Sequence, residues 1–190
     1  MEADWEFELG GDAKAPEVPV IDAPWPGFVD LRNSPERAWQ LSETTQFPVL
    51  AGVLIKLNEA SSPVWTSKCD VWPHLEPDEF DLNELDAPSG CISAMGCYID
   101  LLHRDNQQWA VPDKAAEDCK HMCSLLRVVP LRSCRVDLVI RRACITPELM
   151  CLGITAYFTS CGGSDAEAAV TLQAALVAIP GALCGHSTIE

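Results

Sequence analysis

Basic side chains are scarce in this chain. Its 190 residues include 13 lysines and arginines against 28 aspartates and glutamates, and the formal net charge is −15. A charge of this sign opposes nonspecific attraction to DNA, RNA or an anionic membrane surface. We therefore expect protein or small-molecule partners rather than nucleic acid.

Sequence motifs of catalysis and metal binding are also absent. The chain contains no GxSxG, HExxH or Walker sequence and no CxxC pair. His103-Arg104-Asp105 matches the start of a protein-kinase catalytic loop, but Ala110 stands where that loop needs an asparagine. We predict no catalytic residue, no metal ligand and no cofactor, although a site assembled from distant parts of the chain leaves no such motif.

Long hydrophobic runs are missing as well. The longest apolar stretches are interrupted by Lys56, Gly153 or Thr171, and a helix that crosses a bilayer needs about 20 apolar residues. The acidic start at residues 1–4 is followed by no apolar segment of the kind found in signal peptides. We expect a soluble, cytoplasmic protein without a membrane span.

Cysteine, in contrast, is abundant, with ten residues. In a reducing cytoplasm these thiols are not expected to form disulfides. Cys119 and Cys123 share one side of a predicted helix, whereas His121 is rotated by about 200° from Cys119, so the three cannot bind one ion together. We predict that most cysteines pack as small buried side chains, namely Cys69, Cys91, Cys97, Cys119, Cys123 and Cys134.

The clearest pattern lies in residues 132–176. Alternating apolar residues predict strands at 134–141 and 151–159, and the spacing then becomes helical, with apolar residues at 169, 172, 176 and 179. Ser164 and Glu167 have the spacing of a capping box at the start of this helix. The pattern predicts one sheet face beneath the helix, and the partly polar opposite face favours an antiparallel sheet.

The preceding residues extend this layout. Ser34-Pro35 begins one predicted helix, and a second covers 48–60. Strands at 65–71 and 91–102 follow, and then a helix that Asp113 caps. From residue 34 the predicted order is ααββαββα, or two successive ββα units. We predict an α+β fold with an antiparallel sheet of about four to five strands and helices on one face.

In this order of elements the chain is similar to the acidic type III secretion chaperones and to roadblock-type dimerisation modules. The similarity covers about 150 residues and rests on architecture without a shared motif. It implies a dimerising, protein-binding domain.

Residues 1–27 differ from the rest of the chain. They combine acidic residues and prolines with large apolar side chains that include Trp5, Phe7, Leu9 and Trp25. This composition is typical of an arm that folds on a partner, and equally of an arm packed onto its own domain. We divide the chain into this arm and a single domain at 28–190, with an acidic loop at 73–90.

The scarce basic residues gather between residues 127 and 142. Arg135 and Arg141 share the polar side of a predicted strand with Asp137. Such a cluster forms a solvated surface, binds an anionic partner, or docks the chain's own acidic segments through Coulomb attraction. We favour self-docking or an acidic protein partner. The cluster consists of Arg127, Arg132, Arg135, Arg141 and Arg142.

Two classes of function follow from these features. The first is a non-catalytic protein-interaction module: an acidic adaptor, assembly factor or chaperone-like subunit that joins a complex or a homodimer. The second is a small enzyme or ligand-binding domain with a pocket on the polar sheet face around Arg135, Arg141 and Tyr157, with Asp137 and Thr155 beside them. The predicted partner-binding residues of the first class are Trp5, Phe7, Leu9, Trp25, Phe80, Leu82, Arg135, Arg141 and Tyr157.

Overall fold

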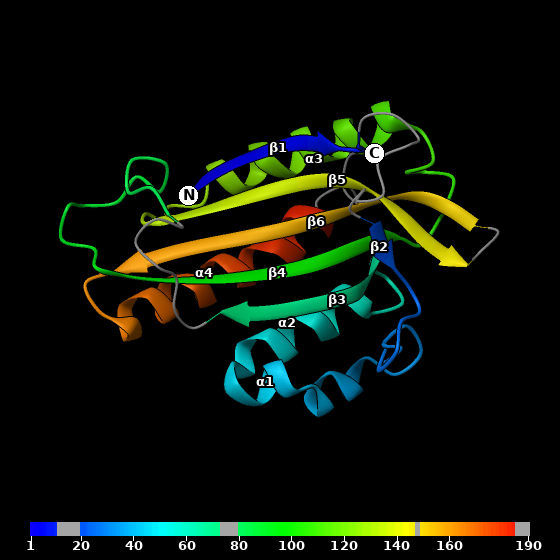
Figure 1. The fold of residues 1–190 in the computed structure, drawn as a ribbon, viewed down its shortest axis with the longest axis horizontal. Helices are drawn as coiled ribbons and strands as arrows, with labels where there is room; N and C mark the ends of the chain where they lie inside the picture. The colour runs from blue at the N-terminus through cyan, green and yellow to red at the C-terminus, as the bar shows by residue number, and fades with distance from the viewer. Residues whose placement is uncertain (11–19, 73–79, 147–148, 185–190) are drawn as a thin grey trace.

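A mixed β-sheet forms the centre of the molecule (Figure 1). The computed structural model describes residues 1–10, 20–72, 80–146 and 149–184. The strand order is β1-β5-β6-β4-β3, and β2 pairs with the far end of β5. The strands are β1 (Glu2–Glu8), β2 (Val20–Asp22), β3 (Val64–Trp72), β4 (Ser93–His103), β5 (Cys134–Thr146) and β6 (Leu149–Gly162).

The predicted α+β class is confirmed, but the prediction of a purely antiparallel sheet is wrong. The neighbours β3, β4, β6 and β5 are antiparallel to one another. Both β1 and β2 run parallel to β5, and they raise the number of strands to six. Parallel neighbours need a long connection, and here more than a hundred residues separate β2 from β5.

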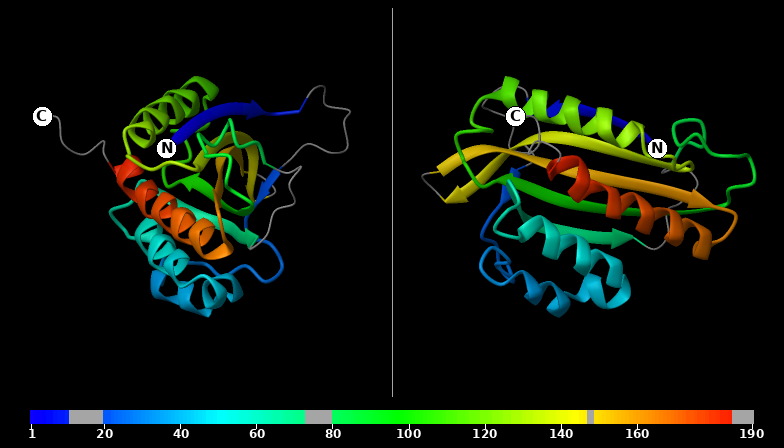
Figure 2. Two further views of the ribbon diagram at one scale, coloured as in Figure 1. Left: turned by 90° about the vertical axis from the view of Figure 1, so that its left-hand side faces the viewer. Right: turned by 180° about the vertical axis from the view of Figure 1, so that it is seen from behind.

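All helices that the structure describes lie on the same side of the sheet (Figure 2). From β3 onward the elements follow the predicted order, whereas three helical segments instead of the predicted two precede β3. The predicted cap of the third α-helix is wrong, because Pro112 starts that helix and Val111, not Asp113, holds the N-cap position. The helices are the 3-10 helix η1 (Pro35–Gln40) and the α-helices α1 (Ser42–Gln46), α2 (Pro48–Asn58), α3 (Pro112–Arg127) and α4 (Asp165–Cys184).

The main core lies between the helices and the sheet. Alternate residues of β5 and β6, among them Val136 and Phe158, are buried on this side, as the period-two pattern predicts. Helix α4 contributes Leu172, Leu176 and Ile179 to the same core. By length and composition alone α4 is also apolar enough to cross a membrane. In this structure that apolar composition serves a helix with one side packed against the sheet.

The opposite side of the sheet, which we call the open face, is covered at its two ends by chain segments rather than helices (Figure 1). Residues 20–32, the N-terminal cover, place Ile21 and Phe28 in a small apolar cluster at one end. Residues 80–92, the acidic cover, place Leu85 in a second cluster at the other end. The middle of the open face lies between the two covers.

The described parts of segment 1–27 pack onto their own chain. Strand β1 pairs with β5 along its whole length. Ala3 is buried, and Trp5 packs against the main core with the ammonium group of Lys120 5.3 Å from its ring. Of the two alternatives that the sequence leaves open, the structure shows packing within the chain for residues 1–10 and 20–27, while residues 11–19 lie outside the described part.

Candidate functional site: a cavity on the open face

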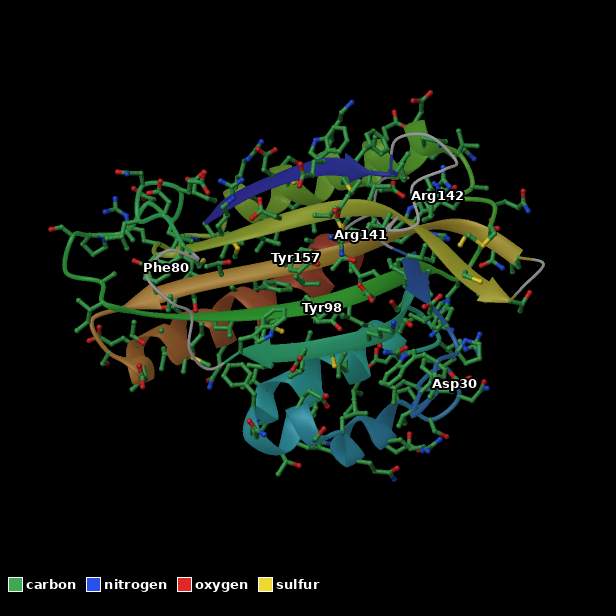
Figure 3. The ribbon with its side chains drawn as sticks, in the orientation of Figure 1. Asp30, Phe80, Tyr98, Arg141, Arg142 and Tyr157 are labelled. Carbon is green, nitrogen blue, oxygen red and sulfur yellow. The ribbon has the colours of Figure 1, made fainter. Side chains whose placement is uncertain are left out.

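A row of aromatic rings crosses the middle of the open face (Figure 3). The ring centres of Trp72 and Tyr98 are 5.5 Å apart, and those of Tyr98 and Tyr157 are 6.0 Å apart. The guanidinium carbon of Arg141 lies 5.2 Å from the Tyr157 ring centre. These four side chains come from β3, β4, β6 and β5, so each of four adjacent strands contributes one.

Strand register explains why these residues meet. Side chains alternate between the two faces of a sheet, and residues opposite each other in neighbouring strands share a face. Tyr98 of β4 lies opposite Tyr157 of β6, and two residues further on Asp100 lies opposite Thr155. The pairing of β4 with β6 therefore brings two phenol groups, a carboxyl group and a hydroxyl group together.

Arg141 is held firmly in this row. Its guanidinium group donates hydrogen bonds to the carboxylate of Glu8 and, at 2.7 Å, to the hydroxyl oxygen of Tyr157. Burial lowers the pKa of Arg141, but its bonds to Glu8 and Tyr157 outweigh burial and raise that pKa overall. Glu8 of β1 thus neutralises the arginine and fixes its orientation.

Asp100 is a buried carboxyl group with one oxygen left free. Only 5% of the residue is exposed, and its Oδ1 accepts a hydrogen bond from the Thr155 hydroxyl at 2.6 Å. Burial raises the pKa of Asp100, and the Thr155 bond together with the charges of Lys68 and Arg141 offsets only part of that effect. Oδ2 has no hydrogen-bond partner among the described residues. Since no described side-chain oxygen or nitrogen is both fully buried and unbonded, this atom reaches open space.

That open space is a cavity of about 370 Å³, which we call the central cavity. Its volume lies in the range of small-molecule sites, roughly 300–1,000 Å³. Aromatic walls, a buried carboxyl group and two cations give it the means to stack a flat group and to bind polar groups beside it. The lining residues are Val20, Ile21, Lys68, Trp72, Tyr98, Asp100, Arg141 and Tyr157.

Of the predicted pocket residues, the structure brings Arg141 and Tyr157 to the central cavity, with Thr155 bonded to Asp100. Arg135 lies elsewhere. Its Nε donates to Asp137 at 2.8 Å, and Nη1 lies 3.4 Å from a carboxylate oxygen of Glu84 in the acidic cover. This arginine therefore anchors the acidic cover instead of lining the cavity.

The predicted partner-binding residues are largely engaged within the chain. Leu9, like Trp5, packs against the main core, and the rings of Phe7 and Trp5 are nearly perpendicular, with ring centres 5.5 Å apart. Phe80 and Leu82 pack on the apolar cluster beneath the acidic cover. The indole nitrogen of Trp25 donates to the Ser67 carbonyl at 3.4 Å. Their role in binding another protein stays a prediction.

The arginine cluster docks acidic segments of the same chain. Beyond the Glu8–Arg141 and Glu84–Arg135 pairs, Arg127 lies 3.9 Å from Asp4 and Arg132 lies 3.8 Å from Asp86. The structure thus shows the self-docking alternative for four of the five arginines. Charges from β1 and the acidic cover neutralise the basic stretch.

Six of the eight cavity residues are not among the predicted pocket residues: Val20, Ile21, Lys68, Trp72, Tyr98 and Asp100. The predicted strand at 91–102 was assigned a buried side, and that assignment places Tyr98 and Asp100 on the opposite, polar side. A signal for these two residues was therefore present. Nothing in the sequence pairs them with Tyr157 and Arg141, because register between distant strands is set by tertiary packing.

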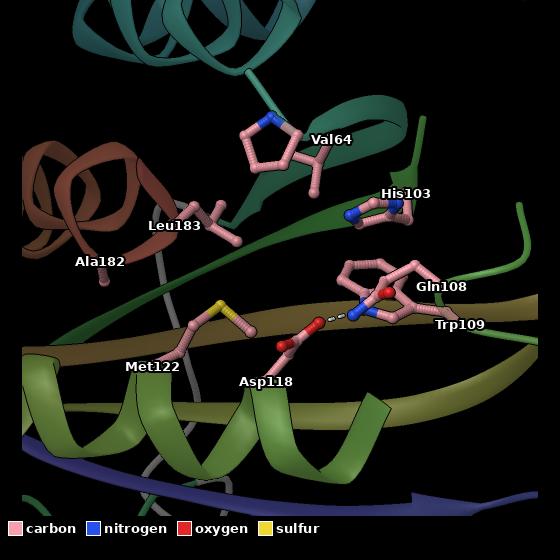
Figure 4. Close-up of a pocket in the computed structure, with 9 residues that line it drawn as sticks. Val64, His103, Gln108, Trp109, Asp118, Met122, Ala182 and Leu183 are labelled. Carbon is pink, nitrogen blue, oxygen red and sulfur yellow. Dashed lines mark hydrogen bonds between the residues drawn. The ribbon is translucent and has the colours of Figure 1, made fainter. Parts of the chain in front are cut away.

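A second cavity, of about 150 Å³, lies where α3 and α4 approach β4 (Figure 4). Its walls are mostly apolar, and its Trp109 indole already donates to Asp118 at 2.8 Å. His103, at its rim, accepts the Asp105 amide at 3.1 Å through Nδ1. The His103-Arg104-Asp105 sequence therefore forms a turn, and Arg104 bonds the carbonyl groups at the end of α2.

Burial works against activation of those described cysteines whose pKa it raises. Among the described residues, no three His, Cys, Asp or Glu side chains are grouped to hold a metal ion. Five of the six cysteines predicted to be buried are buried, and Cys69 is half-buried. Burial raises the pKa of Cys69 to about 12 and that of Cys134 to about 11, so these thiols stay protonated near neutral pH.

No known protein family matches the chain, and comparison with curated proteins and with solved structures gives no significant match either.

Proposed function

We propose that this protein binds a small polar organic molecule in the central cavity of its open face. The free oxygen of Asp100 carries this proposal. A carboxyl group that is almost completely buried costs folding free energy unless its oxygens are hydrogen-bonded. Thr155 satisfies one oxygen, and a bound ligand with a hydrogen-bond donor would satisfy the other.

The surroundings of Asp100 support the same proposal. The rings of Trp72, Tyr98 and Tyr157 give a flat, apolar surface beside the polar groups, and ligand sites commonly combine such walls with a few placed polar groups. Val20 and Ile21, at the start of the N-terminal cover, line one side of the cavity. The interaction with Glu8 holds Arg141 in place before any ligand arrives.

Tyr98 is better suited to binding than to proton transfer. A nucleophile or base that works near neutral pH needs a pKa close to that pH, whereas burial raises the pKa of Tyr98 further above its ordinary value. Tyr98 therefore stays protonated, as a hydrogen-bond donor to a ligand.

The two tyrosines make this proposal easy to test, because the chain has only Tyr98 and Tyr157 and both line the central cavity. Fluorotyrosine labelling gives two ¹⁹F signals, and each reports on the site. We expect hits from a thermal-shift screen of metabolites to move both signals. Asp100→Asn should lower the affinity for these compounds by about tenfold or more. The control Lys56→Met, at an exposed position, should leave the affinities unchanged. A screen without hits, or hits that move neither signal, would contradict the proposal.

A separate observation favours a protein-interaction role, through the outer side of α4. Val170 and Val177 are 65% and 58% exposed, and residues 168–184 include no charged side chain. Two copies of a chain with net charge −15 repel each other, so contact is least costly where charge is absent. The partner proposed for this surface is a second copy of the chain.

Sedimentation equilibrium tests the second candidate. A double variant with Val170→Glu and Val177→Glu should be monomeric where the unchanged chain is dimeric, because each glutamate brings charge into the contact. Val128→Glu, the same substitution at a 75% exposed valine after α3, is the matched control and should stay dimeric. A monomeric unchanged chain at the highest workable concentration would refute this candidate.

A further inference from the structure

The central cavity contains two opposite charges that do not pair with each other. Asp100 presents its free oxygen there, and Lys68 lines the same cavity from β3. No ion pair joins the two side chains, and no carboxylate of a described residue lies within ion-pair distance of the Lys68 ammonium group. The Lys68 ammonium lies 5.7 Å from the Trp25 ring instead.

The other charged group of the cavity is already satisfied. Arg141 has Glu8 and Tyr157 as partners. A ligand therefore meets one cation, Lys68, that has no carboxylate partner among the described residues, and one buried carboxyl group, Asp100. The cavity therefore presents a cation and a carboxyl group at fixed positions, and a ligand with an anionic and a cationic group would complement both.

This arrangement discriminates between ligand charges. An anion would gain from Lys68 but would face the Asp100 carboxyl group. A cation would gain from Asp100 but would face Lys68 and Arg141. A molecule with both charges satisfies each group, since ion pairs and charged hydrogen bonds strengthen where water is excluded.

Resting on the proposed function, we infer that the ligand of the central cavity is a zwitterion of the amino-acid type with an aromatic group. Its ammonium group donates to the free Oδ2 of Asp100, its carboxylate accepts from Lys68, and its ring packs against Trp72 and Tyr98. The cavity volume of about 370 Å³ accommodates a molecule of this size.

Four probe compounds separate the contributions of the ammonium group, the carboxylate and the aromatic ring to binding. L-Phenylalanine has all three groups, phenethylamine lacks the carboxylate, 3-phenylpropionate lacks the amine, and L-alanine lacks the ring. We expect phenylalanine to bind the unchanged protein at least about tenfold more tightly than each of the other three. Isothermal titration calorimetry measures the affinities, and the two fluorotyrosine signals confirm the place of binding.

Two variants with one control assign the charges. Asp100→Asn should lower the affinity for phenylalanine and phenethylamine by about tenfold but leave the affinity for 3-phenylpropionate unchanged. Lys68→Met should lower the affinity for phenylalanine and 3-phenylpropionate but leave the affinity for phenethylamine unchanged. Lys56→Met should change none of them. Melting temperatures near that of the unchanged protein establish that both variants fold.

Two results would overturn the inference: phenethylamine or 3-phenylpropionate binding as tightly as phenylalanine, or either variant weakening all probes equally. If none of the four probes binds while other screen hits still move the tyrosine signals, the zwitterion assignment fails and the proposed binding function stands. If no compound of any kind binds, both fail together.

Discussion

At the scale of single residues, two buried polar side chains are held in opposite ways. Asn58 is fully buried and completely bonded, because its amide nitrogen donates to the Leu54 carbonyl and the Thr66 hydroxyl, and its oxygen accepts the Thr66 amide. Asp100 has one bonded oxygen and one that faces the cavity. The first arrangement serves stability, and the second leaves a group ready for a ligand.

The bonds of Asn58 lead to a stability prediction. Asn58→Ala removes all three bonds and leaves the Thr66 amide and hydroxyl buried without partners, so we expect a loss of about 2–4 kcal/mol in the free energy of unfolding. Chemical denaturation measures it. Asn33→Ala, at an exposed position, is the control and should change stability by less than about 0.5 kcal/mol. A small effect at Asn58 would mean that water replaces its bonds.

The raised pKa of Asp100 leads to a prediction about pH. A carboxyl group with a folded-state pKa above its unfolded value contributes stability below the unfolded pKa, near 4, and loses it as pH rises through the folded pKa. Asp100→Asn has no carboxyl group to ionise, so it does not lose stability through this titration. The melting temperature of this variant minus that of the unchanged protein should therefore become more positive from pH 4 to pH 7.

The difference between the two melting temperatures is the useful quantity, because other groups with a raised pKa, such as Asp137, titrate in both proteins and cancel. Lys68 and Arg141 face Asp100 and act against burial. A difference that stays constant, or becomes more negative as pH rises, would show that these cations prevail.

At the scale of elements, β2 lies over the open face in close van der Waals contact with Gly153 of β6. A β-carbon added at Gly153 of β6 would lie 2.6 Å from the Ile21 side chain of β2 and 3.0 Å from the Leu101 carbonyl oxygen. We expect Gly153→Ala to displace the N-terminal cover and to cost about 1–3 kcal/mol. Hydrogen exchange of residues 20–23 should accelerate.

Gly52→Ala is the matched control for this change. A β-carbon at Gly52, in α2, would meet nothing within 4 Å. Alanine is favoured over glycine inside a helix, so this variant should gain about 0.5–1 kcal/mol. Unchanged exchange at residues 20–23 in Gly153→Ala would show that the cover does not depend on this contact.

Local sequence patterns predict the helices and strands of this protein better than they predict which strands lie next to each other. The alternation around Val136 and Ile154 is visible in the sequence, and so is the capping box, in which Ser164 accepts the Glu167 amide at 3.3 Å. Strand β1 also has a strict alternation of acidic and apolar residues, but the composition of residues 1–27 as a whole indicates an arm. The missing information was its neighbour, since only the folded chain shows that Glu8 faces Arg141.

The candidate site was predictable to the same degree. Arg141 and Tyr157 were placed on the polar sheet face from the alternation of their own strands. Asp100 was missed because an isolated aspartate in a strand has no signature of burial in the sequence. Its burial comes from segments that are distant along the chain, β2 at the central cavity and β6 opposite it.

At the scale of the whole molecule, we expect the net charge to outweigh the individual ion pairs. The pairs Arg127–Asp4 and Arg132–Asp86 have side chains more than half exposed, and such pairs contribute only about 0–1 kcal/mol each. The net charge of −15 adds a general repulsion. We expect the melting temperature to rise when sodium chloride is raised from about 0.01 M to about 0.15 M, because screening relieves that repulsion.

A sucrose solution of equal osmolality serves as the control for this salt series. A melting temperature that falls with salt would mean that the docking of acidic segments on the arginines contributes more than the overall repulsion costs.

Because β1 pairs with β5, it is synthesised long before the strand that it pairs with. Glu8 and Arg141 are 133 positions apart, an interval that a ribosome covers in roughly 7 to 27 seconds at about 5–20 residues per second. During that time the nascent β1, with Trp5 and Phe7 on its apolar side, lacks β5, and for all but the last part of it lacks α3 as well. A translating chain halted before residue 134 would expose this strand to chaperones and proteases.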